Sequence, residues 1–216
     1  MVMVANVQEG RGRPKDISKR QDILDAAGEL FRAGGFHGTS MDALAQAAGV
    51  SKATLYSHFA DKQSLYRALI EAKMADYQVD DFAERVCGDM AADLAMIARQ
   101  MLDLVYDDEA LDMLRMVIAE GREGSDVPSM FEEVGPRRLM GQISDYLAMQ
   151  KQKGVPYISD AVEDANLLGS LVIEHLTMMF CLIGLETPPN ATVRKAHAEK
   201  AVARFIMLKQ SETTLS

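Results

Sequence analysis

Apolar residues recur three and four positions apart along most of the 216-residue chain, which is the spacing of helices with one buried face. No stretch alternates between apolar and polar residues for long enough to predict a strand. The first helix is predicted to begin at Ser18, because Ser18 and Gln21 have the spacing of a capping box, and to end at Gly34-Gly35. Its apolar face comprises Ile23, Leu24, Ala27, Leu30 and Phe31.

Breaks in the same pattern divide the rest of the chain into eight further helices. Most of these breaks contain Gly, Pro or paired Asp residues, which end helices or begin new ones. The predicted ranges are 40–48, 52–58, 62–84, 88–106, 108–122, 127–152, 159–185 and 190–209. The predicted fold is therefore all-α with nine helices: an N-terminal three-helix head, a connecting fourth helix and a five-helix body.

Two short helices separated by a tight turn are predicted at residues 40–58. Thr39 or Ser40 is expected to cap the first of them, and Gly49 to end it with a positive φ angle. Ser51 is expected to cap the second, with Val50 and Leu55 packed across the cap as a hydrophobic staple. This order of elements is typical of a helix-turn-helix, in which the second helix enters the major groove of DNA.

The second short helix presents polar and small side chains near its N-terminus. Ala53 is small enough for close approach to DNA, and Thr54 has both a hydroxyl and a methyl group for base contacts. Lys52 and Lys62 both lie in the first turn of a helix, where the helix dipole disfavours a cation. A nearby phosphate would compensate for this placement, although solvated surface lysines explain it equally well.

The charge of the chain is unevenly distributed. The net charge is −9, but residues 1–75 contain ten basic and eight acidic residues, a net of +2, and the remainder has a net of −11. The total charge therefore does not argue against DNA binding, which depends on where the cations lie.

Residues 167–185 are almost continuously apolar and approach the length of a membrane span. Glu174 and His175 lie in the middle of this segment, where ionisable groups are costly in a bilayer. We therefore predict a buried helix and no membrane partner. Cys87 and Cys181 lie far apart without metal-ligand spacing, which favours a reduced, cytoplasmic setting, and binding to DNA would associate the protein with the nucleoid.

The segment from about Arg20 to Lys73 resembles the DNA-binding domain of the tetracycline-repressor (TetR) family. The resemblance rests on the order and spacing of six elements, which are Ile-Leu-Asp-Ala-Ala…Leu-Phe at 23–31, Gly-Gly-Phe at 34–36, Thr-Ser-Met-Asp-Ala-Leu-Ala at 39–45, Ala-Gly-Val-Ser-Lys-Ala-Thr-Leu-Tyr at 48–56, His-Phe at 58–59 and Asp-Lys-Gln-Ser-Leu-Tyr at 61–66. It implies a nine-helix, Ω-shaped homodimer that binds a near-palindromic operator and is released by a small apolar effector. It also implies a flexible basic arm at 1–16, a helix-turn-helix domain at 17–62 and an effector-binding and dimerisation domain at 63–216.

The resemblance also assigns roles to positions in the head. Backbone phosphates and base edges of double-stranded DNA are expected to contact residues of both short helices. As in other helix-turn-helix proteins, the basic arm could lie in the minor groove of bound DNA, and a solvated tail is the alternative. The expected DNA-contacting residues are Thr39, Ser40, Met41, Ser51, Lys52, Ala53, Thr54, Tyr56, His58, Lys62, Arg11 and Arg13.

The body is rich in methionine, which fills irregular cores and adapts to varied apolar ligands. Residues expected to line an effector pocket are Met113, Met116, Phe131, Leu139, Ile143, His175, Met178 and Met179. The last two predicted helices have more apolar surface than one neighbour covers, which indicates a dimer interface. Residues expected in this interface are Leu168, Leu171, Leu176, Phe180, Ile183, Val202, Phe205 and Ile206.

Other classes of protein fit the sequence less well. The four histidines show no metal-ligand spacing, no Gly-rich phosphate loop is present, and no nucleophile lies beside a base, so neither an enzyme nor a metal or cofactor site is expected. A helical adaptor without DNA binding leaves the basic arm unexplained. Within the regulator interpretation, a transcriptional activator of the same fold is the alternative to a repressor.

Overall fold

The computed structural model describes residues 13–78, 85–122 and 124–215, and within these ranges the chain forms eleven helices and no strand. The prediction of an all-α fold is confirmed. Contacts between residues divide the chain into two units, Met1–Leu69 (the head) and Ile70–Ser216 (the body). The predicted boundary after residue 62 and the observed division after Leu69 both fall within α4 (Lys62–Asp76).

The head contains α1 (Arg13–Gly38), α2 (Met41–Ala47), α3 (Lys52–His58) and the beginning of α4. Gly35, at φ 71° and ψ 170°, interrupts the helical backbone of α1 where the sequence predicted its end. Three aromatic rings hold the centre of the head together: the ring centres of Phe31 and Phe36 lie 5.5 Å apart, and Tyr66 meets both rings edge-on. The other large buried side chains here are Ile23, Leu24, Leu44, Leu55, Phe59 and Leu65.

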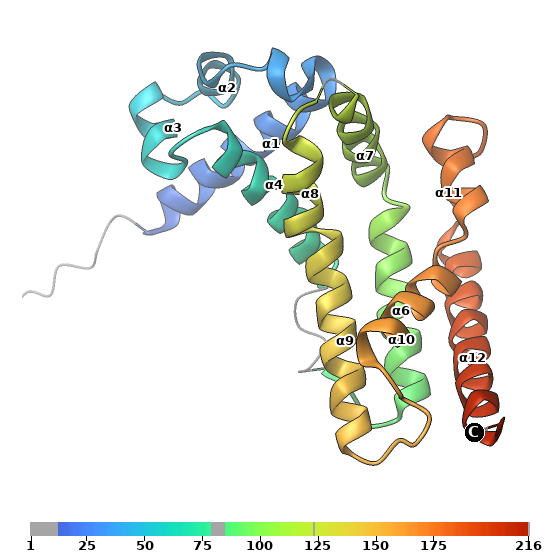
Figure 1. Cartoon of the computed structure of the whole chain (residues 1–216). Helices are drawn as coiled ribbons and strands as arrows, with labels where there is room; N and C mark the ends of the chain where they lie inside the picture. The colour runs from blue at the N-terminus through green and yellow to red at the C-terminus, as the bar shows by residue number, and fades with distance from the viewer. Residues whose placement is uncertain (1–12, 79–84, 123, 216) are drawn as a thin grey trace, which may run out of the picture. The chain divides into compact units, whose positions relative to one another are not determined.

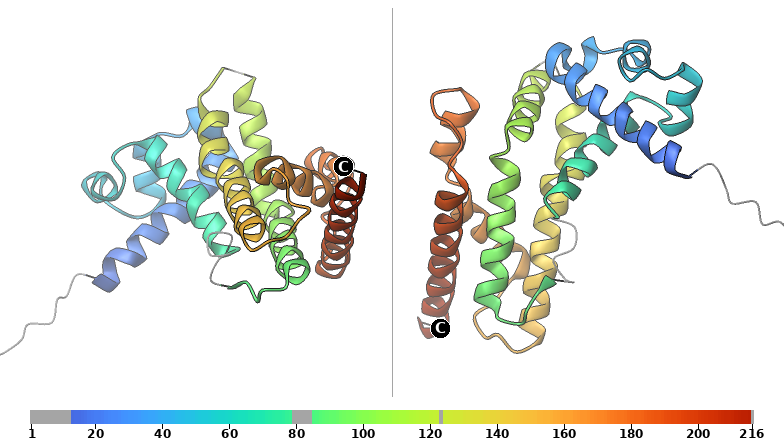
Figure 2. Two further views of the ribbon diagram at one scale, coloured as in Figure 1. Left: turned by 60° about the horizontal axis from the view of Figure 1, so that its bottom comes forward. Right: turned by 180° about the vertical axis from the view of Figure 1, so that it is seen from behind.

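In the described part of residues 70–215, the body contains the end of α4 and seven further helices that pack as a bundle. Their bounds are α6 (Met90–Val105), α7 (Asp108–Gly121), α8 (Val127–Val134), α9 (Pro136–Gln152), α10 (Ala161–Val172), α11 (His175–Leu182) and α12 (Ala191–Leu215). Helix α6 packs along α12, and α10 crosses between α9 and α12 and contacts both (Figures 1 and 2). Helix α7 contacts α8 and α11. The bundle therefore surrounds its interior with helices from residues 70–76, 90–121 and 127–215.

The prediction of nine helices was wrong, because two predicted helices are each divided in the structure. The predicted helix 127–152 breaks at Gly135, whose φ and ψ are −95° and −94°, and Pro136 then begins α9. Proline lacks an N–H group but is tolerated in the first turn of a helix. The predicted helix 159–185 breaks at Ile173 and Glu174, where α10 and α11 meet at an angle of 59°. Helix α4 also ends earlier than predicted, at Asp76.

The second break divides the long apolar segment at residues 167–185 between α10 and α11. Among the residues that the structure describes, no single helix is long and apolar enough to cross a membrane. Helices α10 and α11 have the length and apolar composition of a membrane span only when they are taken together, and they are bent relative to each other.

A buried carboxylate holds the beginning of α6 in place. Asp93 accepts hydrogen bonds from the N–H groups of Cys87 (2.7 Å) and Gly88 (3.3 Å) and from the hydroxyl of Tyr146 (2.9 Å). Burial opposes the ionised form of Asp93, but these donors outweigh it and lower the pKa of the carboxyl group. Burial and the same hydrogen bond raise the pKa of Tyr146.

Candidate DNA-binding surface and candidate effector cavity

The turn between α2 and α3 has the geometry that the sequence predicted. Ser40, rather than Thr39, caps α2 by accepting a hydrogen bond from the Ala43 N–H at 3.1 Å. Ser51 caps α3 by accepting from the Thr54 N–H at 3.1 Å, and Gly49 has a φ of 64°. Two capped helices joined by a residue with positive φ fix the direction in which α3 leaves the turn.

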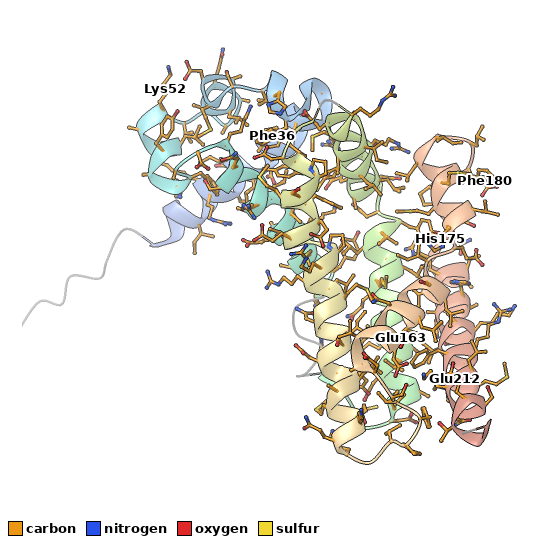
Figure 3. All side chains as sticks on the ribbon, in the orientation of Figure 1. Phe36, Lys52, Glu163, His175, Phe180 and Glu212 are labelled. Atoms are coloured by element: carbon orange, nitrogen blue, oxygen red, sulfur yellow. The ribbon has the colours of Figure 1, made fainter. Side chains whose placement is uncertain are left out.

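One face of α3 is open to solvent, while Leu55 anchors the opposite face in the core of the head. The exposed residues are Lys52, Ala53, Tyr56 and Ser57, and Lys52 is labelled on α3 in Figure 3. Thr54 is half-buried, and its hydroxyl lies 2.9 Å from that of Ser51. The predicted contact residues of α3 therefore form one surface with hydroxyl, phenol and ammonium groups.

The two lysines in first turns have anionic or carbonyl partners within the head. The Lys52 ammonium lies 2.6 Å from a carboxylate oxygen of Asp42, and both side chains are exposed. The Lys62 ammonium donates to the carbonyl oxygens of Phe36 (2.6 Å) and Thr39 (2.8 Å), and it lies 4.5 Å from the centre of the Phe36 ring. The helix-dipole argument therefore does not require a phosphate at these positions, since both ammonium groups have partners within the head, and their contacts with DNA stay predictions.

Thr39 lies in the interior rather than on the surface. Its side chain is 5% exposed, and its hydroxyl is within hydrogen-bonding distance of the carbonyl oxygens of Leu30 (3.1 Å) and Gly35 (2.8 Å) near the end of α1. A side chain buried in this way does not face a phosphate, so the expected contact at Thr39 was wrong. Ser40 is exposed and Met41 is half-buried beside it.

The remaining predicted contacts lie at the edges of the surface. His58 is half-buried at the end of α3, and its ring centre is 6.3 Å from that of Phe59. Arg13 begins α1, but its side chain is outside the described part of the structure, and Arg11 lies outside the described residues altogether.

The body contains a cavity of about 360 Å³. Five of the eight residues predicted for an effector pocket line it: Met113, Phe131, Leu139, His175 and Met178. The sequence analysis did not identify the other lining residues, which are Ile70, Lys73, Met74, Met101, Leu104, Val105, Ala110, Leu114, Gly135, Pro136, Met140, Asn166, Gly169, Ser170 and Ile173. The wall thus draws on α4, on α6 to α11 and on the breaks within the two divided helices.

Three predicted pocket residues do not line this cavity. Met116 and Ile143 are buried elsewhere in the body, and Ile143 lies one turn of α9 beyond Leu139. Met179 follows Met178 and is therefore turned by about 100° around α11, where it is exposed. The placement of these three residues in a pocket was wrong for this cavity.

Helical spacing groups the missed residues on single helix faces, but it does not show that these faces line a cavity. On α4, Ile70, Lys73 and Met74 have the spacing of one helix face, and on α10, Asn166, Gly169 and Ser170 have it too. The missing side chain of Gly169 makes room for Met140. A Cβ atom on residue 169 would lie only 3.2 Å from the Met140 Cε atom.

Lys73 is the lining residue with a permanent charge, and acidic residues of the body neutralise it. Its ammonium lies 2.6 Å from Asp107 Oδ1 and 2.9 Å from Glu109 Oε2. Burial opposes the charged form, but these two hydrogen bonds prevail and raise the pKa of Lys73. The hydroxyl of Tyr77 donates to the other oxygen of Asp107 at 2.8 Å, and burial together with this bond raises the pKa of Tyr77 to about 12.

The cavity is bordered on one side by exposed polar residues of α10 and α11. Asn166, Ser170 and His175 are all exposed lining residues. The Ser170 hydroxyl donates to the Asn166 carbonyl oxygen at 2.9 Å. Among the residues that the structure describes, no three His, Cys, Asp or Glu side chains converge on a possible metal site.

Three residues predicted for a dimer interface are buried inside the body. The exposed fractions of Leu168, Val202 and Phe205 are 1%, 2% and 0%, so the expectation that they meet a partner was wrong. Leu176 and Ile183, by contrast, are 66% and 61% exposed on and just after α11. Leu171, Phe180 and Ile206 are half-buried.

Further exposed apolar side chains lie on α10 to α12 and on the segment that follows α11. These residues are Val162, Met179, Leu185, Val193, Met207 and Leu208. The continuous helix predicted for 159–185 explains only why Met179 and Leu185 were missed, because they lie beyond its break and were placed on the wrong faces.

Comparison with known proteins gives matches over both units. The family described as "Bacterial regulatory proteins, tetR family" matches residues 23–69, and the one described as "AefR-like transcriptional repressor, C-terminal domain" matches residues 92–208. The chain is 28% identical over 159 residues to the uncharacterised regulator YvkB of Bacillus subtilis (strain 168), an alignment that covers 71% of this chain and 78% of YvkB.

Solved structures of regulators are also similar to the whole chain. A TetR transcriptional regulator of Agrobacterium tumefaciens is 30% identical with a TM-score of 0.70, and the match covers 88% of this chain and 93% of that one. The flavonoid-responsive regulator FrrA is 29% identical with a TM-score of 0.68, and the match covers 88% and 96%. Because the C-terminal family match alone covers more than half of the 216 residues, the chain belongs to the TetR family of transcriptional regulators.

Proposed function

We propose that the protein is a repressor that binds a near-palindromic operator as a homodimer and releases it when a small apolar molecule enters the cavity of the body. The observation that carries this proposal is the exposed face of α3, because a capped, solvent-facing second helix after a tight turn is what major-groove reading requires. A repressor that binds an operator in genomic DNA would act at the nucleoid, in the cytoplasm.

In the proposed complex, α3 lies in the major groove. Lys52 supplies positive charge, Ala53 permits close approach, and Tyr56 donates a phenolic hydrogen bond to a phosphate. The exposed hydroxyl of Ser40 lies at the start of α2, where backbone N–H groups favour a second phosphate. Arg11 and Arg13 remain candidates for contacts in the minor groove.

The proposed dimer buries the exposed apolar side chains of α11 and α12. The exposed side chains of Leu176 and Met179 on α11, Ile183 just after it, and Val193 and Met207 on α12 support this proposal, because a twofold interface buries the same surface of each subunit. Such a dimer presents two copies of α3 to successive major grooves, which lie about 34–36 Å apart.

The proposed effector is an apolar molecule held in the cavity of about 360 Å³, a size within the range of small-molecule sites. Ile70, Lys73 and Met74 of α4 belong to its wall, and the beginning of the same helix belongs to the head. A ligand that prefers one position of α4 would shift the head between conformations with different affinities for DNA. The name of the similar regulator FrrA, which is described as flavonoid-responsive, is consistent with an apolar aromatic effector.

The test is fluorescence anisotropy of the full chain on labelled DNA from its own upstream region, compared with scrambled DNA at two salt concentrations. We expect tight, salt-sensitive and sequence-selective binding that weakens in Thr54→Ala and Tyr56→Phe. Ser129→Ala, an exposed position on α8, is the control and should bind as wild type does.

A promoter–reporter measurement then decides between repression and activation. Higher reporter output after deletion of the regulator supports a repressor, whereas lower output identifies an activator. Equal, weak binding to every fragment of a genomic DNA selection would refute DNA-binding regulation altogether.

A further inference from the structure

The polar lining residues of the body cavity are unevenly placed. Asn166, Ser170 and His175 belong to α10 and α11, and His175 stands at the junction of the two helices (Figure 3). Within the described residues, no hydrogen bond engages the side chains of Asn166 and His175. Both side chains are therefore able to bind a polar group of a ligand.

The charge around the cavity argues against an anionic ligand. Lys73 is the residue that a carboxylate would seek, but its ammonium is already bound to Asp107 and Glu109. One cation beside two carboxylates leaves a local excess of negative charge. A ligand carboxylate near Lys73 would lose its hydration and meet this negative charge, so a neutral ligand is favoured.

The apolar wall has the composition that suits flat aromatic rings. Five methionines line the cavity, and thioether sulfur makes favourable contacts with aromatic rings. Phe131 adds a ring that can stack or meet a ligand ring edge-on. The lining methionines are Met74, Met101, Met113, Met140 and Met178.

We propose that the effector is an uncharged aromatic compound with a hydroxyl group at one end, bound with its rings among the methionines and its hydroxyl between Asn166 and His175. This inference rests on the proposed function and specifies the ligand class of the same cavity. The Asn166 amide donates to the hydroxyl oxygen, and the hydroxyl donates to the Asn166 carbonyl oxygen or to an unprotonated ring nitrogen of His175.

Three compounds with the same stilbene core, which differ only in the group at position 4, test the proposal: trans-stilbene, 4-hydroxystilbene and stilbene-4-carboxylate. Binding to the full chain is measured by the fluorescence of the stilbene, which is free of tryptophan background because the chain has no Trp. We expect 4-hydroxystilbene to bind about three to ten times more tightly than stilbene, as one neutral hydrogen bond implies, and the carboxylate to bind more weakly than both.

The double variant Asn166→Leu/His175→Phe should bind stilbene as wild type does but lose the preference for 4-hydroxystilbene. Glu163→Gln, an exposed change on α10 outside the lining, is the matched control and should keep that preference. Retention of the preference by the double variant would overturn the assignment of the two side chains.

Failure of this inference is distinguishable from failure of the proposed function. Tightest binding of the carboxylate, or binding of none of the three compounds, would overturn the neutral aromatic class, while operator binding in the anisotropy assay would still support the regulator. Loss of operator binding would overturn the proposed function whatever the stilbene series gives.

Discussion

Lys52 and Asp42 form an ion pair between α3 and α2 on the surface proposed to face DNA. Because both side chains are exposed, the pair contributes little to folding. The ion pair is expected to affect DNA binding instead. A phosphate must replace Asp42 as the partner of the Lys52 ammonium, and the Asp42 carboxylate adds negative charge near the DNA backbone. Asp42 is therefore expected to restrain DNA affinity.

We expect Asp42→Asn to increase operator affinity without changing the thermal midpoint of unfolding. Lys52→Gln should weaken binding and reduce the slope of log K against log salt concentration by about 0.9, the value for one phosphate contact. Both are measured by anisotropy over a salt series, with Lys195→Gln, an exposed lysine of the body, as the control. An unchanged slope in Lys52→Gln would show that Lys52 does not contact phosphate.

The buried pair of Asp93 and Tyr146 is expected to show in the pH dependence of stability. The folded state lowers the pKa of Asp93, so its stabilisation is full above the ordinary value of 3.8 and is lost as the pH falls through the lower folded value. Tyr146→Phe removes one donor to a buried carboxylate and should lower the free energy of unfolding by about 1–3 kcal/mol at neutral pH.

Chemical denaturation of Tyr146→Phe at pH 7 and near pH 3 measures this effect, with Tyr157→Phe as the control at a half-buried tyrosine. The destabilisation should shrink at the acidic pH, where Asp93 begins to be protonated. If the free energy of unfolding falls by the same amount at both pH values, the Tyr146 hydroxyl stabilises the fold through packing and not through its hydrogen bond to Asp93.

The ends of α2 and α3 were predictable because capping residues and glycine mark them, whereas the predicted start of the first helix at Ser18 was wrong, since α1 begins at Arg13 and Ser18 lies inside it. Ser40, Gly49 and Ser51 stand where the backbone requires a hydroxyl acceptor or a positive φ. The break at Ile173 and Glu174 was not predictable, because neither residue is a helix breaker and the apolar pattern continues through it. Packing in the bundle, and not local sequence, determines that bend.

The cavity was predictable only in its methionine-rich character. Met113, Phe131 and Met178 were identified from composition and periodicity, whereas the contribution of α4 depends on how helices pack, which no local pattern records. Thr39 was misplaced for a related reason, since a threonine before a helix is as suited to completing the preceding helix end as to meeting a phosphate.

Helix α10 approaches α9 at Gly169, and this contact controls the size of the cavity. A methyl group at Gly169 would press on the flexible end of Met140, which lines the cavity. Gly169→Ala should therefore displace Met140 into the cavity and weaken binding of 4-hydroxystilbene by at least about tenfold, with operator binding unchanged.

The matched control is Gly141→Ala on α9, where no atom lies within 4 Å of the added Cβ. It should leave ligand binding unchanged and stabilise the fold by up to about 1 kcal/mol through helix propensity. Equal ligand affinity in both variants would contradict a role of Gly169 in shaping the site.

The whole molecule joins a slightly basic N-terminal third, with a net charge of +2, to a body in which residues 76–216 have a net of −11. Acidic surfaces repel DNA, so the charge distribution directs the head toward it. The apolar side chains exposed on α11 and α12 are proposed to meet a partner, because large apolar side chains exposed close together are typical of interaction surfaces.

Leu176→Asp/Ile183→Asp is expected to convert a dimer into monomers in sedimentation or light-scattering measurements. Operator affinity should fall by at least about a hundredfold, because each half-site is then bound independently. Ile118→Asp, an exposed apolar position on α7, is the control and should remain dimeric. A dimer in the double variant would place the interface elsewhere.

The five methionines of the cavity wall make ligand sensing sensitive to oxidation. Conversion of a thioether to a sulfoxide turns an apolar lining polar, so peroxide treatment should abolish stilbene binding and leave the protein bound to its operator. Methionine sulfoxide reductases should restore the response, and a variant with leucine at Met74, Met101, Met113, Met140 and Met178 should resist the treatment. An oxidised cell would then keep the regulated genes silent even when the inducing compound is abundant.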